Sequence, residues 1–462
     1  MLFFEYLSGL VGKKVAVVGA GVSNLPLIER LLEAGVSTTI RDKRSRSEME
    51  AVAERFERLG ARLCLGAGYL DSIDEDLIFR TPGIMPWNPA FEAAVQRGAV
   101  LTSEMEVFFD VCPCKIIAVT GSDGKTTTTS IIAELLRRQG LTVHLGGNIG
   151  NPLLCGADAM GSDDIAVLEL SSFQLITMRK SPNIAVITNI SPNHLDVHRD
   201  YDEYVNAKRN IFLHQSSADI VILNYDNEIT RGFARETRSE VRFFSRRARV
   251  DNGVYYENGA ISEVSSIQGG TIIRTDEIRL PGTHNVENYM AAFAAVSGLV
   301  GYDAMRATAR TFQGVRHRLE LVSERQGVKY INDSIATTPT RTTAGLKAFD
   351  RKVILIAGGY DKGLDFTQLG VEICEYVKTL ILTGHTAGRI RDAVINAPGT
   401  VDKPDIFTYD NFEDAVKAAS EKAKDGDIVL LSPACASFDS FSNFEERGEA
   451  FGRIVDQLGT RD

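Results

Sequence analysis

The residues from Val119 to Thr128 read VTGSDGKTTT and bring two glycines, a lysine and a row of hydroxyls together. The glycines let backbone N–H groups approach phosphate oxygens, and a helix starting here would add its positive dipole end. Lys125 supplies a cation for outer phosphates, and the Thr126 hydroxyl can ligate Mg²⁺. Val119 stands where the standard loop has its first glycine, so a shortened T-G-x-x-G-K-T-T remains. The stretch predicts a nucleoside triphosphate site; a glycine turn that merely contains lysine is the alternative.

Polar residues follow two later apolar runs, at the points where buried strands would end. Glu169 closes the run from 165 to 168, and His194 follows the run from 184 to 187. Because the carboxyl ends of parallel strands meet at one sheet edge, both side chains should converge on the phosphate loop. Glu169 and His194 are therefore candidate holders of Mg²⁺ or its waters, although magnesium prefers oxygen to histidine nitrogen. A hydrogen-bonded loop residue is the alternative at each position.

A second glycine turn, Gly19-Ala20-Gly21, follows an apolar run near the N-terminus, with Asp42 about 20 residues further on, as in dinucleotide sites. Asn24 replaces the third glycine of that fingerprint, so a site for a nucleoside diphosphate fits as well as an NAD site. Lys43 and Arg44, next to Asp42, could meet phosphate. The turn from 81 to 84 follows another expected strand, at the edge where α/β ligands bind.

Three strand ends near the C-terminus carry hydroxyls, three aspartates and one lysine. They are Ile331 to Ser334, Ile356 to Gly363, and Leu431 to Asp439. This set suits a small zwitterion or a dicarboxylate, with Lys362 facing a carboxylate. Cys435 is better interpreted as a small residue in a tight turn than as a nucleophile, because no histidine is near in sequence. Arg318 could reach a bound triphosphate or form an interface salt bridge.

Parallel sheets are needed to position these side chains, and the alternation of apolar runs with helical patterns predicts three of them. We expect an α/β fold of three domains, 1–109, 110–315 and 316–462. The first and third should be Rossmann-like, and the second a P-loop-type ATPase domain. From 241 to 280, alternating stretches with Asn-Gly turns predict a small antiparallel appendage. In the third domain the expected strands are Lys329–Asn332, Val353–Ala357, Leu380–Thr383, Ile406–Tyr409 and Ile428–Leu431.

Bulk composition argues against several classes of protein. The net charge of −10 argues against a broad nucleic-acid surface. No apolar run approaches membrane-spanning length, and the first ten residues lack the basic region of a signal peptide. The six cysteines contain no C-x-x-C pair, which favours reduced thiols over metal fingers or a disulfide scaffold. We expect a cytoplasmic monomer that binds neither nucleic acid nor membrane.

Taken together, these motifs resemble the Mur ligases, the ATP-dependent amide-forming enzymes that build the stem peptide of peptidoglycan. The resemblance covers essentially the whole chain, and its other motifs are Gly146–Gly150, Leu168–Leu175, Asn193–Asp196 and Ser432–Phe444. SSFQL at 171–175 and SPACAS at 432–437 are most similar to the members that add D-glutamate. The resemblance implies that ATP phosphorylates the carboxylate of UDP-N-acetylmuramoyl-L-alanine, and that the amine of D-glutamate attacks the acyl phosphate. Positioning and Mg²⁺ would then supply most of the catalysis.

The resemblance also implies roles for single residues. Lys208, a surface lysine by composition alone, would be carbamylated and become a metal ligand. The catalytic positions are Lys125, Glu169, His194 and Lys208, and the metal positions are Thr126, Glu169, His194 and Lys208. The ATP positions are Gly121, Ser122, Asp123, Gly124, Lys125, Thr126, Thr127, Asn285, Asn288 and Arg318. The UDP-substrate positions are Val22, Ser23, Asp42, Lys43, Arg44, Gly83, Asn148 and His194, and the amino-acid positions are Thr337, Lys362, Ser437, Phe438 and Phe444.

One stretch departs from the family pattern. The D-glutamate-adding members commonly read N-D-S-K-A-T-N, whereas Ile335 replaces the lysine here. We expect Arg341 or Lys362 to supply the missing cation near the amino-acid carboxylates. Another ligase of this fold, such as folylpolyglutamate synthase or a different stem-peptide enzyme, is the nearest alternative. An NAD-dependent oxidoreductase and a non-catalytic nucleotide-binding regulator are the more distant ones.

Overall fold

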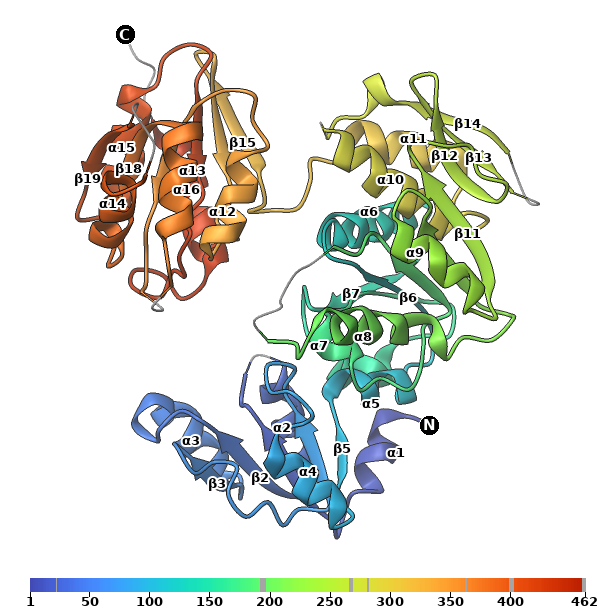
Figure 1. The fold of residues 1–462 in the computed structure, drawn as a ribbon. Helices are drawn as coiled ribbons and strands as arrows, with labels where there is room; N and C mark the ends of the chain where they lie inside the picture. Colours follow the sequence, from blue (N-terminus) through green and yellow to red (C-terminus); the bar gives the residue numbers. More distant parts are fainter. Residues whose placement is uncertain are drawn as a thin grey trace. The chain divides into compact units, whose positions relative to one another are not determined.

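A computed structural model describes residues 1–21, 23–191, 197–265, 269–280, 282–361, 364–398 and 403–458. The chain divides into two compact units, Met1–Phe312 and Gln313–Asp462. The first unit contains a five-stranded and a nine-stranded sheet, and the second a six-stranded sheet (Figure 1). The sheets are mainly parallel and carry helices, which confirms the predicted three-domain α/β fold. None of the described helices combines the length and apolar character needed to cross a bilayer.

The N-terminal sheet is fully parallel, with strand order β3-β2-β1-β4-β5. Alternate residues of β1 enter two different hydrophobic clusters, so the strand is buried on both faces and reads as an unbroken apolar run. The strands are β1 (Lys14–Val18), β2 (Ser37–Asp42), β3 (Arg62–Leu65), β4 (Leu77–Arg80) and β5 (Val100–Thr102). The helices are α1 (Phe3–Ser8), α2 (Asn24–Glu33), η1 (Ser47–Met49), α3 (Glu50–Arg58), α4 (Pro89–Gln96) and α5 (Glu104–Val111).

In the central sheet, β6 lies between β9 and β8, and the phosphate loop follows β6. Ile117 and Val119 of β6 pack with α6 and α10 on one face, while Ile116 and Ala118 face the cluster that includes α8 (Figure 1). The parallel strands are β6 (Lys115–Thr120), β7 (Val143–Gly147), β8 (Ile165–Glu169), β9 (Ile184–Ile187), β10 (Ile220–Asn224) and β11 (Glu240–Ser245). The helices are α6 (Lys125–Arg138), η2 (Leu154–Ala159), α7 (Ser172–Leu175), α8 (Tyr201–Leu213), α9 (Glu228–Gly232), η3 (Phe233–Arg235), η4 (Thr275–Glu277), α10 (Thr283–Val296) and α11 (Tyr302–Thr311).

The predicted antiparallel appendage continues the central sheet. It consists of β12 (Gly253–Glu257), β13 (Ala260–Val264) and β14 (Gly269–Arg274), which pair antiparallel in that order. Asn258 and Gly259 form the turn between β12 and β13, with φ of 51° and 79°, as a type I′ hairpin requires. The predicted hairpin turn at Asn252-Gly253 was wrong. β12 pairs with β11 in parallel, and a hairpin turn joins antiparallel strands.

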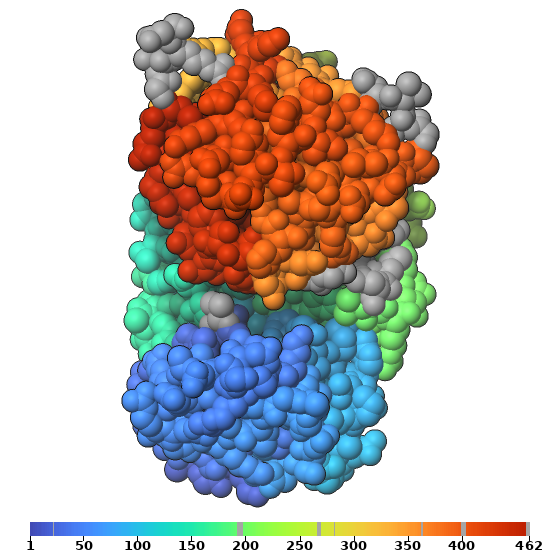
Figure 2. All heavy atoms as spheres, turned by 90° about the vertical axis from the view of Figure 1, so that its left-hand side faces the viewer, coloured from blue at the N-terminus to red at the C-terminus, as the bar shows by residue number. Residues whose placement is uncertain are grey.

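The C-terminal sheet has the order β15-β16-β20-β17-β18-β19, and only the pair β15–β16 is antiparallel among these described strands. Its strands are β15 (Glu320–Arg325), β16 (Val328–Asn332), β17 (Val353–Ala357), β18 (Val377–Leu382), β19 (Asp405–Thr408) and β20 (Ile428–Leu431). Its helices are α12 (Pro339–Leu346), α13 (Thr367–Tyr376), α14 (Ala387–Ile395), α15 (Phe412–Lys422) and α16 (Phe444–Gln457). The prediction missed β15, because this edge strand is only partly buried and lacks an apolar run. In the all-atom view the unit is a closely packed orange-to-red body (Figure 2).

Candidate active site

The phosphate loop joins β6 to α6 and is held against the end of β9. Gly121 and Gly124 have φ of 145° and 76°, which disfavours any residue with a side chain. A Cβ atom at Gly121 would collide with the Thr188 hydroxyl, which instead donates a 2.6 Å hydrogen bond to the Asp123 carbonyl. The Asp123 N–H in turn donates to Asn189 Oδ1 at 3.0 Å. The loop is therefore fixed in shape by the neighbouring strand end.

Lys125 and Thr126 begin α6 and point to different partners. The Lys125 Nζ folds back over the loop and donates to the carbonyls of Gly121 at 3.0 Å and Ser122 at 2.8 Å. The Thr126 hydroxyl donates to Glu169 Oε2 at 2.6 Å. The side-chain amide of Asn148 donates to the other oxygen, Glu169 Oε1, at 2.8 Å. Both oxygens of a buried carboxylate at the end of β8 are thus oriented beside the loop.

Lys208 is 2% exposed, so it is not the surface lysine that composition suggested. It lies on α8, and its Nζ donates to the Gly121 carbonyl at 2.8 Å and to Thr120 Oγ1 at 3.4 Å. The same Nζ lies 4.7 Å from the centre of the Tyr204 ring. Burial, and next the charge of Lys125, lower the pKa of Lys208 well below its ordinary value. The neutral amine is therefore more populated here than on an exposed lysine.

Two asparagines of α10 lie against the first turns of α6. Asn288 Oδ1 accepts a 3.3 Å hydrogen bond from the Thr128 hydroxyl, and its amide donates to Asn285 Oδ1 at 3.2 Å. Both asparagines are buried, as is Thr127 in the first turn of α6. His194 lies outside the described residues. Arg318 is exposed and belongs to the second unit.

Most of the predicted UDP-substrate positions lie at or after the ends of β1 and β2, whereas Asn148 follows β7. Asp42 accepts hydrogen bonds from the Ala20 N–H at 2.9 Å and from the Arg44 Nη2 at 2.8 Å. Burial alone would raise the pKa of Asp42, but the bonds from Arg44 and Ala20 outweigh it and lower that pKa. Lys43 is exposed. Three positions remain: Ser23 precedes α2, Gly83 lies in the turn after β4, and Val22 is outside the described residues.

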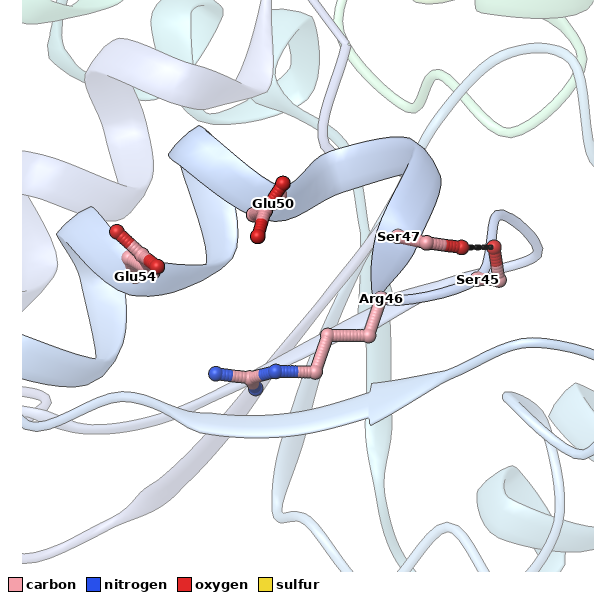
Figure 3. Close-up of a pocket in the computed structure, with 5 residues that line it drawn as sticks. All are labelled: Ser45, Arg46, Ser47, Glu50 and Glu54. Carbon is pink, nitrogen blue, oxygen red and sulfur yellow. Dashed lines mark hydrogen bonds between the residues drawn. The ribbon is translucent and has the colours of Figure 1, made fainter.

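An open hollow adjoins this cluster, lined by Ser45, Arg46, Ser47, Glu50 and Glu54 (Figure 3). The hydroxyls of Ser45 and Ser47 lie 3.0 Å apart, and Arg46 pairs with Glu57 at 2.5 Å. Glu50 and Glu54 leave the lining acidic, which repels phosphate. The strand ends at Ala20 and Asp42 are therefore the better candidate for a diphosphate.

The amino-acid positions lie around the ends of β16 and β20. Ser437 is buried and its carbonyl accepts from the Phe441 N–H at 2.8 Å. Phe438 is 58% exposed and meets the Tyr360 ring edge-on at 6.0 Å. The Phe444 carbonyl accepts from the Ser334 hydroxyl at 2.8 Å. Thr337 is half-buried, and Lys362 lies outside the described residues.

The residues around Ile335 bear on the missing lysine. The Arg341 Nη1 donates to the Ile335 carbonyl at 3.2 Å, so this guanidinium lies beside the substituted position. Asp333, two residues earlier, is buried and accepts from the Ser432 hydroxyl at 2.8 Å. Burial raises the pKa of Asp333 to about 7. Compensation by Arg341 or Lys362 stays a prediction.

Several residues at these strand ends were missed from sequence. Thr188 and Asn189 shape the phosphate loop, and the Tyr204 hydroxyl lies 2.8 Å from Ser122 Oγ. The polar residues that follow the run from 184 to 187 were a visible signal for Thr188 and Asn189. Arg447 was also missed, although it binds the ends of both β16 and β20.

The donors near the phosphate loop fit a magnesium ion. Mg²⁺ binds through one or two protein oxygens together with waters and substrate phosphates. Glu169 and Thr126 present a carboxylate and a hydroxyl oxygen in contact with each other. Within the described residues, no group of three or more histidine, cysteine, aspartate or glutamate side chains forms a metal cluster. A site that depends on substrate phosphates agrees with both observations.

Comparison with known families finds two matches. The family described as Mur ligase middle domain matches residues 119–296, and that described as Mur ligase, glutamate ligase domain matches residues 317–435. The chain is 49% identical to the UDP-N-acetylmuramoylalanine–D-glutamate ligase of Acetivibrio thermocellus, covering 98% of each chain. It is 47% identical to the enzyme of the same name from Clostridium novyi, covering 99% of each.

Solved structures show the same fold at low identity. UDP-N-acetylmuramate-alanine ligase from Thermotoga maritima has a TM-score of 0.57 and 17% identity, covering 96% of this chain and 99% of that one. MurF from Acinetobacter baumannii has a TM-score of 0.56 and 15% identity, covering 99% of this chain and 93% of that one. The FolC protein of E. coli, in complex with DHPP and ADP, has a TM-score of 0.54 and 16% identity, covering 76% and 91%.

Proposed function

The chain belongs to the Mur ligase family, and we propose that it adds D-glutamate to UDP-N-acetylmuramoyl-L-alanine at the expense of ATP, in peptidoglycan synthesis. The observation that carries this function is the identity of 47–49%, over nearly the full length, to relatives named as D-glutamate ligases. The FolC protein of E. coli shares only the fold, at 16% identity. The oxidoreductase alternative was wrong, because 98% of the chain matches a relative named as a ligase.

The reaction needs an activated acid, because hydroxide is too poor a leaving group for a carboxylate and an amine to condense in water. Transfer of the γ-phosphoryl group of ATP converts the carboxylate to an acyl phosphate. The amine then attacks the acyl carbon, and inorganic phosphate leaves. Such catalysis consists mostly of positioning and of stabilising developing negative charge.

We assign the triphosphate to the loop from Gly121 to Thr127. Lys125 would exchange the carbonyls of Gly121 and Ser122 for outer phosphate oxygens, which are stronger acceptors. The backbone N–H groups at the start of α6 would orient the same oxygens. Asn285 and Asn288, buried beside α6, would border the nucleotide. Arg318 stays a further expected ATP position.

We assign Mg²⁺ to Thr126 and Glu169, with His194 and Lys208 as further positions. Mg²⁺ bound there would neutralise charge on the transferring phosphoryl group. Asn148 fixes the orientation of the Glu169 carboxylate by holding its second oxygen. The muramoyl end of the substrate would lie near Asn148 and His194.

We further propose that Lys208 is carbamylated. Its nitrogen would bond to the carbon of CO₂ and lose a proton to solvent, giving an anion. The neutral amine is the reacting form, and the buried position of Lys208 favours it. A carbamate would turn the cation that now repels Lys125 into a metal-binding anion.

The finer assignments belong to the same proposal. The domains are 1–109 for the UDP-substrate, 110–315 for ATP and 316–462 for the amino acid. We expect a monomer that acts in the cytoplasm on small molecules. The UDP-substrate residues are Val22, Ser23, Asp42, Lys43, Arg44, Gly83, Asn148 and His194, and the amino-acid residues are Thr337, Lys362, Ser437, Phe438 and Phe444.

Mass spectrometry of the product tests the function. The protein is incubated with ATP, Mg²⁺ and UDP-N-acetylmuramoyl-L-alanine, and D- or L-glutamate is offered separately. We expect a glutamyl product and stoichiometric phosphate with D-glutamate, and neither with L-glutamate. A product with L-glutamate alone, or on a folate acceptor, would assign the chain to a different ligase.

A further inference from the structure

Arg447 is a cation buried inside the C-terminal unit. It lies in the first turn of α16, and only 2% of it is exposed. Its Nε donates to Ser334 Oγ at 3.0 Å, and its Nη2 donates to the Ser334 carbonyl at 3.0 Å. Nη2 also donates to the Cys435 carbonyl at 3.1 Å, and Nη1 to the Ala436 carbonyl at 3.2 Å. One guanidinium thus binds the chain that leaves β16 and the chain that leaves β20.

The end of a third strand, β17, also lies against Arg447 and the Ala436 carbonyl. Gly359 follows β17 with φ of 148°, and a Cβ there would meet the Ala436 carbonyl and lie 3.2 Å from Arg447 Nη1. The Tyr360 N–H donates to the Ala436 carbonyl at 2.9 Å. Ser437 and Phe438 come directly after Ala436 in the chain. The guanidinium therefore fixes the backbone that carries the proposed amino-acid residues Ser437 and Phe438.

The partners of Arg447 are all neutral. Among the described residues, no carboxylate lies within 4.0 Å of its guanidinium, and its four acceptors are three carbonyls and a hydroxyl. Burial lowers the pKa of Arg447 to about 10, so the group stays charged at neutral pH. Burying a charge without a counter-ion is costly, and proteins usually avoid it. The charge of Asp439 acts on Arg447 only from a longer range, without an ion pair, so the positive charge is available to an anion that binds at these strand ends.

We propose that Arg447 is a positioning residue for the amino-acid substrate: it fixes the ends of β16 and β20 and supplies a positive charge that selects for a second carboxylate. This inference rests on the proposed function. Arg447 also gives the pocket a cation next to Ile335, which replaces the lysine of the family pattern. Arg447 acts through Ser334 and through the backbone at 435 and 436, without touching the substrate.

The test measures steady-state kinetics for wild type, Arg447→Met and Arg447→Lys. With Met we expect the KM for D-glutamate to rise by about tenfold or more, since a charge and its hydrogen bonds are lost. The KM values for ATP and the UDP-substrate should stay within about twofold of wild type. The ratio of kcat/KM for D-glutamate over D-glutamine should fall with Met and recover in part with Lys, which retains the charge.

Arg325→Met is the matched control in the same unit. Arg325 also donates to backbone carbonyls, those of Asp456 and Leu458 at the far end of α16. We expect this change to leave the KM for D-glutamate and the glutamate-to-glutamine ratio unchanged. An equal effect of both arginine variants would overturn the proposal, because it would reflect general loss of packing.

Other outcomes separate selection from structure. If Arg447→Met folds but changes all three KM values alike, or lowers only kcat, the proposal is wrong. If it does not fold, Ser334→Ala decides: this variant keeps the charge and removes one acceptor, and we expect a smaller rise confined to the KM for D-glutamate. No change in that KM would overturn the proposal. Failure of wild type to use D-glutamate would instead reject the proposed function.

Discussion

The phosphate loop and the proposed amino-acid pocket both lie at strand ends, yet they hold their cations differently. Lys125 and Lys208 contact the loop through single nitrogen atoms on flexible chains, whereas Arg447 is fixed by four hydrogen bonds. A lysine ammonium can exchange a carbonyl for an incoming phosphate, while the rigid arginine fork defines a fixed surface. From this comparison we expect the proposed ATP site to rearrange around its ligand, and the proposed amino-acid pocket to be formed before its ligand binds.

Lys125→Ala should have the largest effect, because it removes the cation that rearranges. We expect kcat for phosphate release to fall by about 10²- to 10³-fold, as when a donor to a developing anion is lost. Binding of the UDP-substrate, measured by calorimetry, should be unchanged. Lys115→Ala, at the exposed start of the same strand, serves as the control and should retain wild-type turnover. Normal turnover in Lys125→Ala would show that the loop does not act on ATP.

Lys208→Met should have the next largest effect. We expect a loss of turnover of about tenfold to hundredfold, the range found when residues supporting a metal are removed. Wild type incubated with ¹³C-bicarbonate should show a carbamate carbon signal by NMR, and Lys208→Met should lack it. Removing CO₂ should slow wild type but not the variant. A wild-type protein without the signal, and indifferent to CO₂, would refute carbamylation.

Sequence reasoning predicted the proposed ATP site in more detail than the proposed amino-acid pocket, because the residues of the first are contiguous. Gly121, Lys125 and Thr126 lie close together in the sequence. Glu169 was added because it follows a predicted parallel strand. Three of the contacts that hold the pocket cross about 110 or more residues along the chain, as between Ser334 and Arg447. No local pattern encodes such a pairing. The strand-end rule indicated the stretches that contain Lys362, Ser437 and Phe438, and family resemblance added Thr337 and Phe444.

One local signal would have found both buried cations. On α8, Tyr204, Lys208 and Ile211 are all buried and follow the i, i+4, i+7 spacing of an apolar stripe. On α16, Arg447, Phe451 and Val455 follow the i, i+4, i+8 spacing of such a stripe. A charged residue at an apolar position of an amphipathic helix must be buried or shift the helix face. Composition alone predicted that Lys208 lies on the surface, because composition contains no information on which face of the helix a residue occupies.

The smallest expected effect concerns Asp333, which adjoins the fixed pocket. Burial raises the pKa of its carboxyl from 3.8 to about 7. Between these values the unfolded chain has lost the proton while the folded chain keeps it, so the folded state binds more protons. Stability from this group is therefore greatest below about pH 4 and is lost as pH rises through about 7. Asp333→Asn should remove that part of the pH dependence.

Calorimetric scans at pH 5 and pH 8 test this, with the transition of the C-terminal unit followed separately because several domains unfold. We expect the Tm of wild type to fall by more between pH 5 and pH 8 than the Tm of Asp333→Asn. Glu104→Gln is the matched variant in the first unit, since burial raises the pKa of Glu104 to about 7 as well. Glu104→Gln should reduce the pH dependence of Tm for the first unit alone. An Asp333→Asn profile parallel to that of wild type would contradict the raised pKa of Asp333, and it would mean that water reaches this carboxyl.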